Sequence, residues 1–332
     1  MDSWTRTPRK RSAAVITAVC AAVGALLGVT GYVLTNDPAP KASPSHLQAS
    51  AAPSRITVID WNICGEAGGQ RGARGYCPNR NRPDLTVSEI RAMVDERKAD
   101  VITLQEVCGG APGSHLALLE EALDDSWTVR RARGTRPDGA ADCRGSLTGE
   151  LGIAIAVRGK VTAEASSNTL SDEEPQSGEQ VSPVLCVDVE GWSYRVCTTH
   201  LLPSSDKRGS AQAERIVRRA APDGKPYILT GDFNRDSKSP ELAPFTTALT
   251  ECKQLTRSGQ FTHHAWDPKI SDHVYRTLDH VFASAGEDGA PPKFANCGVD
   301  RTRMDTTPNT EGTVPNGKSD HAPVYATISL RR

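Results

Sequence analysis

Six short motifs along this chain bring together side chains that could hold a divalent cation beside a histidine. Each motif ends or directly follows an apolar run typical of a strand. In order they are Asp60-Trp61-Asn62, Leu104-Gln105-Glu106, Thr199-His200-Leu201, Gly231-Asp232-Phe233-Asn234, Leu278-Asp279-His280 and Ser319-Asp320-His321. Carboxylate and amide oxygens are the ligands that a hard cation prefers, and an imidazole can act as a base beside them. One such motif is weak evidence, whereas the ordered set predicts a single site.

The chemistry that these side chains suggest is hydrolysis of a phosphate ester. A bound Mg²⁺ can polarise a phosphoryl oxygen and orient water, and it needs only a few protein ligands. Glu106 is the best ligand candidate, and Asn62 offers a neutral oxygen. Asp320 and His321 are adjacent, so their side chains would diverge on an extended chain. To serve one centre they must lie at a strand entrance, with Asp320 near the metal and His321 near the attacking water. An ordinary strand-end acid, a turn asparagine and a surface histidine are the alternatives.

Two of the motifs carry a resemblance to a known family. Gly231–Asn234 and Ser319–Val324 resemble the most specific motifs of the endonuclease/exonuclease/phosphatase superfamily, which includes DNase I, abasic-site endonucleases, neutral sphingomyelinases and inositol-polyphosphate phosphatases. The likeness extends from about Arg55 to Leu330. Strand pairs with covering helices already fit an α+β sandwich. The resemblance implies four layers, with two packed mixed β-sheets flanked by helices, as in DNase I.

The resemblance also implies roles for individual residues. Asp279 would fix the tautomer of the base His321, and Asp232 would orient the nucleophilic water. Asn234 would donate its amide to the phosphate, and His200 would contact the phosphate or help to protonate the leaving oxygen. An extended backbone from Asp232 to Asn234 would put both side chains on one face. Mg²⁺ is the expected cation, with Mn²⁺ or Ca²⁺ as alternatives.

Strands and helices alternate along the part of the chain that carries the motifs. One helix is expected at Thr86–Lys98, with Val87, Ile90, Met93 and Val94 on one stripe. The other expected helices are Leu116–Leu123 and Ser210–Ala220. The expected strands are Arg55–Trp61, Asp100–Glu106, Leu151–Val157, Val184–Val189, Ser193–Thr199, Pro226–Thr230, Thr277–Phe282 and Pro323–Leu330.

The first 54 residues differ in composition from the rest. Residues 12–35 form a run of 24 uncharged residues, long enough at about 1.5 Å per residue to cross a hydrocarbon core of roughly 30 Å. Residues 1–11 are basic, so the positive-inside tendency places them in the cytoplasm. We therefore expect a transmembrane signal-anchor, or alternatively a cleaved signal peptide and a secreted protein. Residues 36–54 are a linker rich in Pro, Ala and Ser, and 55–332 form the catalytic domain outside the cell.

Cysteine usage agrees with export. The eight cysteines that follow the apolar run favour disulfides, and the absence of C-x-x-C argues against a zinc site. A two-residue Gly191-Trp192 loop would place Cys186 opposite Cys197, as a hydrogen-bonded pair with Cα atoms about 5.5 Å apart. Neighbour pairing of the other six is a guess: Cys64–Cys77, Cys108–Cys143 and Cys252–Cys297.

Other histidines and arginines have weaker claims to a role. No metal-binding helical spacing joins four further histidines, so they are expected to be structural or to lie at the rim of the site. They are His263, His264, His273 and His280. Four arginines follow Asn62 in a loop that should overhang the site, where one could bind a phosphate. They are Arg71, Arg74, Arg80 and Arg82. An ordinary charged surface loop is the preferred interpretation.

Charge and motifs together favour an enzyme. The net charge is −1, and residues 55–332 hold 34 basic and 38 acidic side chains, so an indiscriminate nucleic-acid binder is disfavoured. We expect an exported, Mg²⁺-dependent phosphoesterase, acting as a monomer, and prefer a nuclease. The alternatives are a phosphodiesterase or phosphatase acting on lipid head groups or inositol phosphates, and a binding module without turnover.

Overall fold

The computed structural model describes residues 53–66, 71–72, 76–203, 205–236, 238–252 and 260–330. The basic segment 1–11, the apolar run 12–35 and all but the last two residues of the linker lie outside this part, as does Arg74. Among the described residues, no helix is long and apolar enough to cross a membrane.

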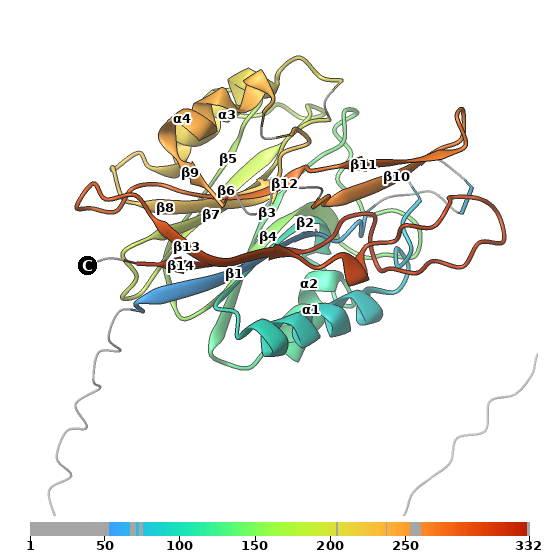
Figure 1. Ribbon diagram of the computed structural model, residues 1–332, viewed down its shortest axis with the longest axis horizontal. Helices are drawn as coiled ribbons and strands as arrows, with labels where there is room; N and C mark the ends of the chain where they lie inside the picture. The colour runs from blue at the N-terminus through green and yellow to red at the C-terminus, as the bar shows by residue number, and fades with distance from the viewer. Residues whose placement is uncertain are drawn as a thin grey trace, which may run out of the picture. The chain divides into compact units, whose positions relative to one another are not determined.

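Two six-stranded mixed sheets form the framework (Figure 1). The first has the order β13 (Lys293–Val299), β14 (Val324–Ser329), β1 (Arg55–Asn62), β2 (Val101–Gly109), β4 (Glu150–Arg158) and β3 (Trp127–Arg133). The second has the order β5 (Val161–Asn168), β6 (Pro183–Val189), β7 (Arg195–His200), β8 (Tyr227–Asp232), β12 (Asp279–Ala283) and β9 (Thr250–Glu251). The pairs β1–β2 and β7–β8 are parallel, and the other neighbours are antiparallel.

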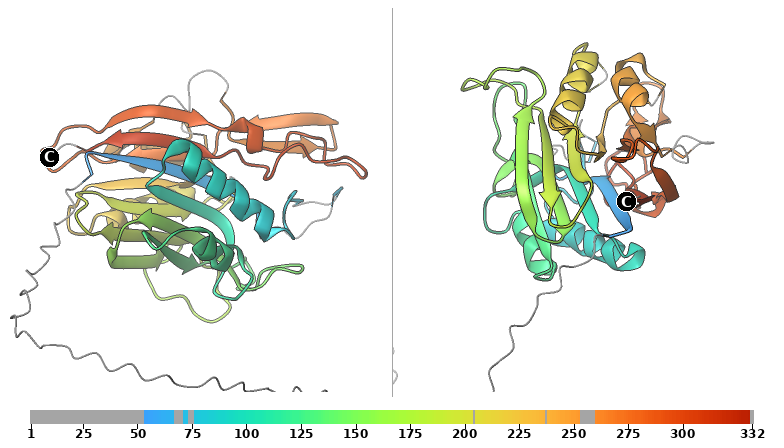
Figure 2. Two further views of the ribbon diagram at one scale, coloured as in Figure 1. Left: turned by 90° about the horizontal axis from the view of Figure 1, so that it is seen from below. Right: turned by 90° about the vertical axis from the view of Figure 1, so that its left-hand side faces the viewer.

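Helices cover the outer face of each sheet. In Figure 1, α1 (Pro83–Arg97) and α2 (His115–Ala122) lie below the first sheet, and α3 (Gly209–Ala220) and α4 (Ala243–Ala248) above the second. Figure 2 shows α1 lying along β1 in a view from below. One apolar core lies between the sheets, a second under α1 and α2, and a third under α3 and α4. The predicted four-layer α+β sandwich is confirmed.

Three smaller elements complete the fold. A two-stranded hairpin is formed by β10 (His263–Asp267) and β11 (Asp272–Arg276). Two short 3₁₀ helices are η1 (Pro240–Leu242) and η2 (Arg301–Arg303). The first residue of β10 also bridges to His321, which connects the hairpin to the sandwich.

The strands that the sequence predicted are the inner strands of the two sheets. The missed ones are the four edge strands β3, β5, β9 and β13, together with the hairpin β10–β11. In β5, for example, most side chains are exposed. An edge strand pairs on one side only and is often polar, so it lacks the apolar alternation by which a strand is predicted.

All eight cysteines of the described residues form disulfides, with the predicted pairing. They are Cys64–Cys77, Cys108–Cys143, Cys186–Cys197 and Cys252–Cys297. The register that places Cys186 opposite Cys197 is also confirmed. The turn differs from the prediction: the N–H of Trp192 donates to the Val189 carbonyl (3.0 Å), so the turn begins one residue earlier. The two Cα atoms are 4.1 Å apart, close to the spacing of a non-hydrogen-bonded pair.

Candidate active site

The predicted site residues meet at one end of the sandwich. Asn62, His200 and Asp232 are the last residues of β1, β7 and β8. A cavity of about 370 Å³ opens there. Six of the eight predicted residues line it, namely Glu106, His200, Asp232, Asn234, Asp320 and His321. The other two, Asn62 and Asp279, are buried and hydrogen-bond to residues of this cavity.

Glu106 lies where β2 departs from regular geometry. The register between β2 and β4 shifts between Leu104 and Val107, as in a β-bulge. Glu106 itself has φ of +51°, a conformation that costs free energy in a residue other than glycine. Its carbonyl accepts the N–H of Gly65 (3.0 Å), and a Cβ at Gly65 would lie 2.8 Å from that oxygen. The bulge thus directs the Glu106 side chain into the cavity.

Asn62 connects the two sheets at the base of the cavity. Its amide nitrogen donates to Glu106 Oε1 (3.2 Å) and to Asp232 Oδ2 (3.0 Å), and its Oδ1 accepts the N–H of Cys64 (2.9 Å). In this orientation the amide holds the two carboxylates together. That Asn62 binds a metal through its side-chain oxygen stays a prediction.

The loop before β14 brings Asp320 and His321 to the same cavity. The Ser319 hydroxyl donates to the Asn62 carbonyl (2.8 Å) and accepts the N–H of His321 (3.0 Å). The indole N–H of Trp61 donates to the His321 carbonyl (3.0 Å). These bonds fix the loop on the end of β1, so two adjacent residues can serve one centre. The serine and the tryptophan of the motifs therefore position the residues that follow them.

His321 and Asp279 form a buried pair. The Nδ1 atom of the imidazole lies 2.9 Å from one carboxylate oxygen of Asp279 and 3.1 Å from the other, and Nε2 lies 3.6 Å from Asp232 Oδ2. Burial alone would lower the pKa of His321, but the carboxylates of Asp279 and Asp232 raise it well above its usual value. Burial also raises the pKa of Asp279, against the opposing charge of His321.

Asp232 lies between the two histidines of the cavity. Its Oδ2 atom is 3.4 Å from His200 Nε2, and its Oδ1 accepts the N–H of Asn234 (2.8 Å). Burial opposes ionisation of Asp232, but His321 and His200 lower its pKa below the usual value. The predicted extended backbone from Asp232 to Asn234 is wrong, because Asn234 has φ of +52°. This turn brings the Asn234 amide nitrogen to 3.1 Å from His200 Nε2 and 2.9 Å from the Leu201 carbonyl.

The other two residues of the Gly231–Asn234 motif, Gly231 and Phe233, have packing roles. A Cβ at Gly231 would lie 2.1 Å from the Thr199 carbonyl oxygen, so only glycine fits beside β7. The Phe233 ring is fully buried and meets Phe245 and Phe282 edge to face. The motif therefore combines close strand packing, an apolar anchor and two polar side chains in the cavity.

The charges in the cavity fit a divalent cation. Burial raises the pKa of Asp320 to about 7, and the carboxylates of Glu106 and Asp232 act in the same direction against the charge of His321. A cation among these oxygens would relieve the repulsion between them. The donor set is rich in oxygen, as Mg²⁺ prefers. The residues here therefore fit a divalent cation.

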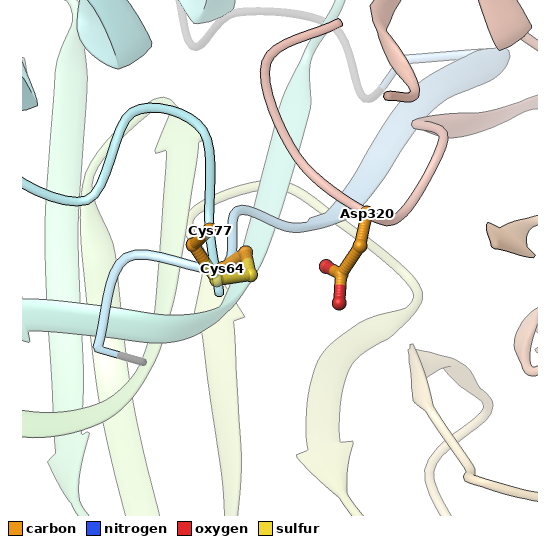
Figure 3. A group of neighbouring side chains, drawn as sticks. All are labelled: Cys64, Cys77 and Asp320. Carbon is orange, nitrogen blue, oxygen red and sulfur yellow. A yellow bond between two sulfur atoms is a disulfide. The ribbon is translucent and has the colours of Figure 1, made fainter. Parts of the chain in front are cut away.

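The cysteines near Asp320 do not belong to a metal site. The sulfur atoms of Cys64 and Cys77 and a carboxylate oxygen of Asp320 lie within 4.8 Å of one another (Figure 3). Because a disulfide joins the two sulfurs, they offer no thiolate to a cation. The disulfide instead holds the chain that follows Asn62.

His263 lies at the rim of the site, one of the two places expected for it. It lines the cavity, and its ring centroid is 4.6 Å from that of His321. Burial lowers the pKa of His263 to about 3, and the positive charges of His321 and Arg276 act in the same direction. Its Nδ1 has no hydrogen-bond partner among the described residues. The pairing of β10 with the loop before β14 creates this position, and no local pattern indicated it.

The other predicted histidines lie away from the cavity. His280 pairs with Glu251 (2.8 Å) and approaches the Arg235 carbonyl (2.9 Å), on the side of β12 opposite Asp279. His264 contacts His273 (2.8 Å) on the hairpin. They act as structural residues.

A buried polar network beneath the cavity was not predicted. Asp60 Oδ1 accepts from the Thr103 hydroxyl (2.7 Å) and from the Gln105 amide (2.8 Å). Across the interface, Gln105 contacts the Thr198 hydroxyl (3.1 Å), and Thr230 bonds to Thr103 (2.7 Å). Burial raises the pKa of Asp60 to about 8, and the charge of Asp279 acts in the same direction. These side chains join β1 and β2 to β7 and β8 just below the site.

Solved structures share this arrangement of sheets and helices. The catalytic domain of human nocturnin, with a bound sulfate anion, aligns with a TM-score of 0.56 at 19% identity, over 84% of this chain and 95% of that one. A mannosyl-6-phosphatase from Bacteroides thetaiotaomicron aligns at 0.58 and 18%, over 82% and 99%. D. rerio TDP2 with a single-strand DNA product aligns at 0.55 and 15%, over 83% and 99%. At these identities the likeness establishes the fold.

Sequence comparison identifies the family to which this chain belongs. No curated protein matches the chain. The sequence model of the endonuclease/exonuclease/phosphatase family matches residues 61–321, a span that runs from the end of β1 to the histidine of the last motif. Over that span lie all of the residues that meet in the cavity, so the chain belongs to the endonuclease/exonuclease/phosphatase family and is a hydrolase of phosphoester bonds.

Proposed function

We propose that this hydrolase is a Mg²⁺-dependent nuclease that cleaves phosphodiester bonds by in-line attack of water. The observation that carries the proposal is that Glu106, Asp320 and His321 line one cavity, with Asp279 bonded to His321 behind it. When bound at these oxygens, Mg²⁺ polarises a phosphoryl oxygen and opposes the carboxylates that hold a proton on His321.

His321 is the general base in this proposal. Asp279 holds Nδ1, so the Nε2 atom faces Asp232 and the cavity. Asp232 stays ionised because two histidines lower its pKa, and it orients the water that His321 deprotonates. A base held in this way contributes about 10²–10⁴-fold to a hydrolysis rate.

His200 and Asn234 act on the phosphate. The His200 side chain is 25% exposed, whereas the neighbouring Asp232 and His321 are buried. With the Asn234 amide beside it, His200 is placed to bind a phosphoryl oxygen or to give a proton to the leaving oxygen. TDP2, one of the proteins that share the fold, was solved with a single-strand DNA product, which supports a nucleic-acid substrate.

A phosphatase or head-group phosphodiesterase is the second candidate. A mannosyl-6-phosphatase shares the fold, and the acidic balance of residues 55–332 suits a small ester better than a long polyanion. Phospholipid head groups and inositol phosphates are the substrates to compare.

One set of assays separates the candidates. The purified full-length chain is incubated with plasmid DNA, RNA, sphingomyelin and inositol phosphates, with Mg²⁺ or with EDTA. We expect nicking of nucleic acid that EDTA abolishes and that His321→Ala removes. Release of a head group or of inorganic phosphate, with intact plasmid, would replace the nuclease with the second candidate.

We also propose that the catalytic domain is exported and anchored by residues 12–35. The uncharged run behind a basic segment and the four disulfides support this location. Protease added to intact cells should digest the domain in full while cytoplasmic markers survive. Protection of the domain until the cells are lysed would contradict export.

A further inference from the structure

A second cavity adjoins the catalytic one. Its volume is about 510 Å³, and it lies between the hairpin β10–β11, residues 71–72 and 76–78, and the loop at 305–309. Asp320 lines both cavities. A substrate whose scissile phosphate lies at the catalytic residues can therefore extend past Asp320 into this second space.

One arginine of the second cavity is already neutralised. The Arg71 guanidinium lies 3.4 Å from Asp305 Oδ2 and donates to the Thr307 hydroxyl (2.8 Å) and to the Thr313 carbonyl (2.9 Å). It also stacks on the Tyr76 ring, 4.4 Å from the centroid. These contacts make Arg71 and Asp305 a wall of the cavity. Neither charge is left for a ligand.

Arg276 is different. Its side chain is exposed, lines the second cavity and makes no ion pair with any carboxylate of the described residues. Arg276 is the cross-strand partner of His263, which lines the catalytic cavity. Side chains of cross-strand partners lie on the same face, so this guanidinium stands beside the catalytic end of the hairpin.

The acidic residues of the hairpin lie at its other end. Asp267 pairs with Asp272 next to the turn, four residues along β11 from Arg276, or roughly 13 Å at 3.3 Å per residue. Asp267 Oδ1 also accepts the N–H of Lys269 (2.9 Å). The end of the cavity nearest the catalytic residues thus presents the Arg276 guanidinium, which has no ion pair in the part of the chain that the structure describes.

We propose that Arg276 binds a second phosphate of the substrate, the one that adjoins the scissile phosphate. A planar guanidinium can donate two parallel hydrogen bonds to a phosphate, and an unpaired one does so without breaking an existing ion pair. The inference rests on the proposed phosphoesterase function, and in a nucleic acid the second phosphate is that of the neighbouring nucleotide. Arg276 is therefore a specificity residue. Substrates with a single phosphate do not use it.

The test compares substrates that differ only in the second phosphate. The full-length chain with Mg²⁺ is assayed on dithymidine monophosphate, and on the same dinucleotide with an added 5′ or 3′ terminal phosphate. An inositol monophosphate and a bisphosphate form the parallel small-ester arm. Arg276→Ala should raise KM at least about tenfold on a substrate with the second phosphate and leave kcat unchanged. The single-phosphate substrate should change less than twofold.

Two matched variants sharpen the result. Arg276→Lys keeps the charge without the planar fork, so it should recover part of the lost affinity. Arg55→Ala removes the same charge from an exposed residue at the opposite end of β1 and should leave every substrate unaffected. On polynucleotide, Arg276→Ala should also reduce the salt dependence of binding by about one phosphate contact, whereas Arg55→Ala should not.

The outcomes are distinct. Equal losses on single-phosphate and two-phosphate substrates would place Arg276 at the scissile phosphate and overturn the proposal, as would no loss on either. Dependence on the second phosphate in only one arm supports the proposal and identifies the substrate class. If the wild-type chain cleaves none of these esters, it is the proposed function that fails.

Discussion

The two ends of the interface between the sheets are built from different side chains on the same strands. Along the inward face of β1, the apolar Ile56 and Val58 are followed by Asp60 and then by Asn62 in the site. Three other strands change in the same way. Their inward residues read Val101, Thr103, Gln105 on β2; Val196, Thr198, His200 on β7; and Ile228, Thr230, Asp232 on β8.

The difference separates stability from chemistry. The apolar end removes hydrocarbon from water, the main favourable term in folding. The polar end holds hydrogen-bonded groups that fix the orientation of the catalytic side chains. Two atoms of its buried network, Asp60 Oδ2 and Gln105 Oε1, have no hydrogen-bond partner among the described residues. Three non-glycine residues with positive φ also lie there, Cys64, Glu106 and Asn234, at a cost of order 1–3 kcal/mol each. The apolar end must offset that cost.

The largest effect should come from the polar end. His321→Ala removes the base and should lower kcat about 10²–10⁴-fold, with Asp279→Asn giving a smaller loss in the same direction. Both are measured by initial rates on the preferred substrate. Unfolding in urea should show a folded protein in each case. A His321→Ala variant that is folded and fully active would show that His321 is not the base.

A substitution at the apolar end should lower stability and leave kcat almost unchanged. Ile56 is fully buried between the sheets and lies six residues before Asn62 on the same strand. Ile56→Ala should lower the free energy of unfolding by about 2–5 kcal/mol because it leaves a cavity. The kcat of the folded fraction should stay within about twofold of wild type. A large fall in kcat would show that the two ends are not separable.

Glu106→Gln tests the cation. Loss of one ligand charge should raise the Mg²⁺ concentration for half-maximal activity by about 10–100-fold, measured by titrating EDTA-treated protein with Mg²⁺. Glu190→Gln is the control, because Glu190 is 65% exposed at the β6–β7 turn. The same Mg²⁺ curve for both variants would exclude Glu106 as a ligand.

A further effect should be a change in the pH dependence of stability, which arises in the polar network itself. Burial raises the pKa of Asp60 to about 8, so the folded protein keeps its proton while the unfolded chain releases it near 3.8. The contribution of Asp60 to the free energy of unfolding is fully present below pH 4 and is lost as the pH rises to about 8. The free energy of unfolding falls over this range by at most about 1.4 kcal/mol per pH unit.

Asp60→Asn resembles the protonated acid and should flatten this part of the stability curve. The check is urea unfolding of both proteins from pH 4 to pH 8. Parallel curves for the two proteins would mean that Asp60 ionises with its ordinary pKa and that water reaches the network.

Much of the fold could be predicted from local patterns. The eight inner strands and the first three α-helices follow from apolar alternation and helical stripes, because burial on one or both faces forces those patterns. The edge strands could not be predicted, since their side chains meet water. The pairing of Cys186 with Cys197 followed from hairpin register, although the turn itself was placed one residue too late.

The candidate site divides in a similar way. Residues at strand ends, such as Glu106 and Asp232, stand next to strong apolar runs and could be recognised. His263 and Arg276 lie on a hairpin without such a run, and only its docking on the loop before β14 brings them to the cavities. Of the arginines expected at the site, Arg71 is paired with Asp305 and Arg82 with Asp84.

Local sequence patterns are enough to show which side chains stand at the ends of the buried strands, because backbone geometry alternates inward and outward residues over a few positions. Only tertiary packing brings those ends together, joins two carboxylates through the Asn62 amide and leaves Arg276 without an ion pair among the described residues. Trp61 bonds to His321 across 260 positions, and a contact of that kind depends on how the sheets pair and pack. Local sequence patterns do not reach that far.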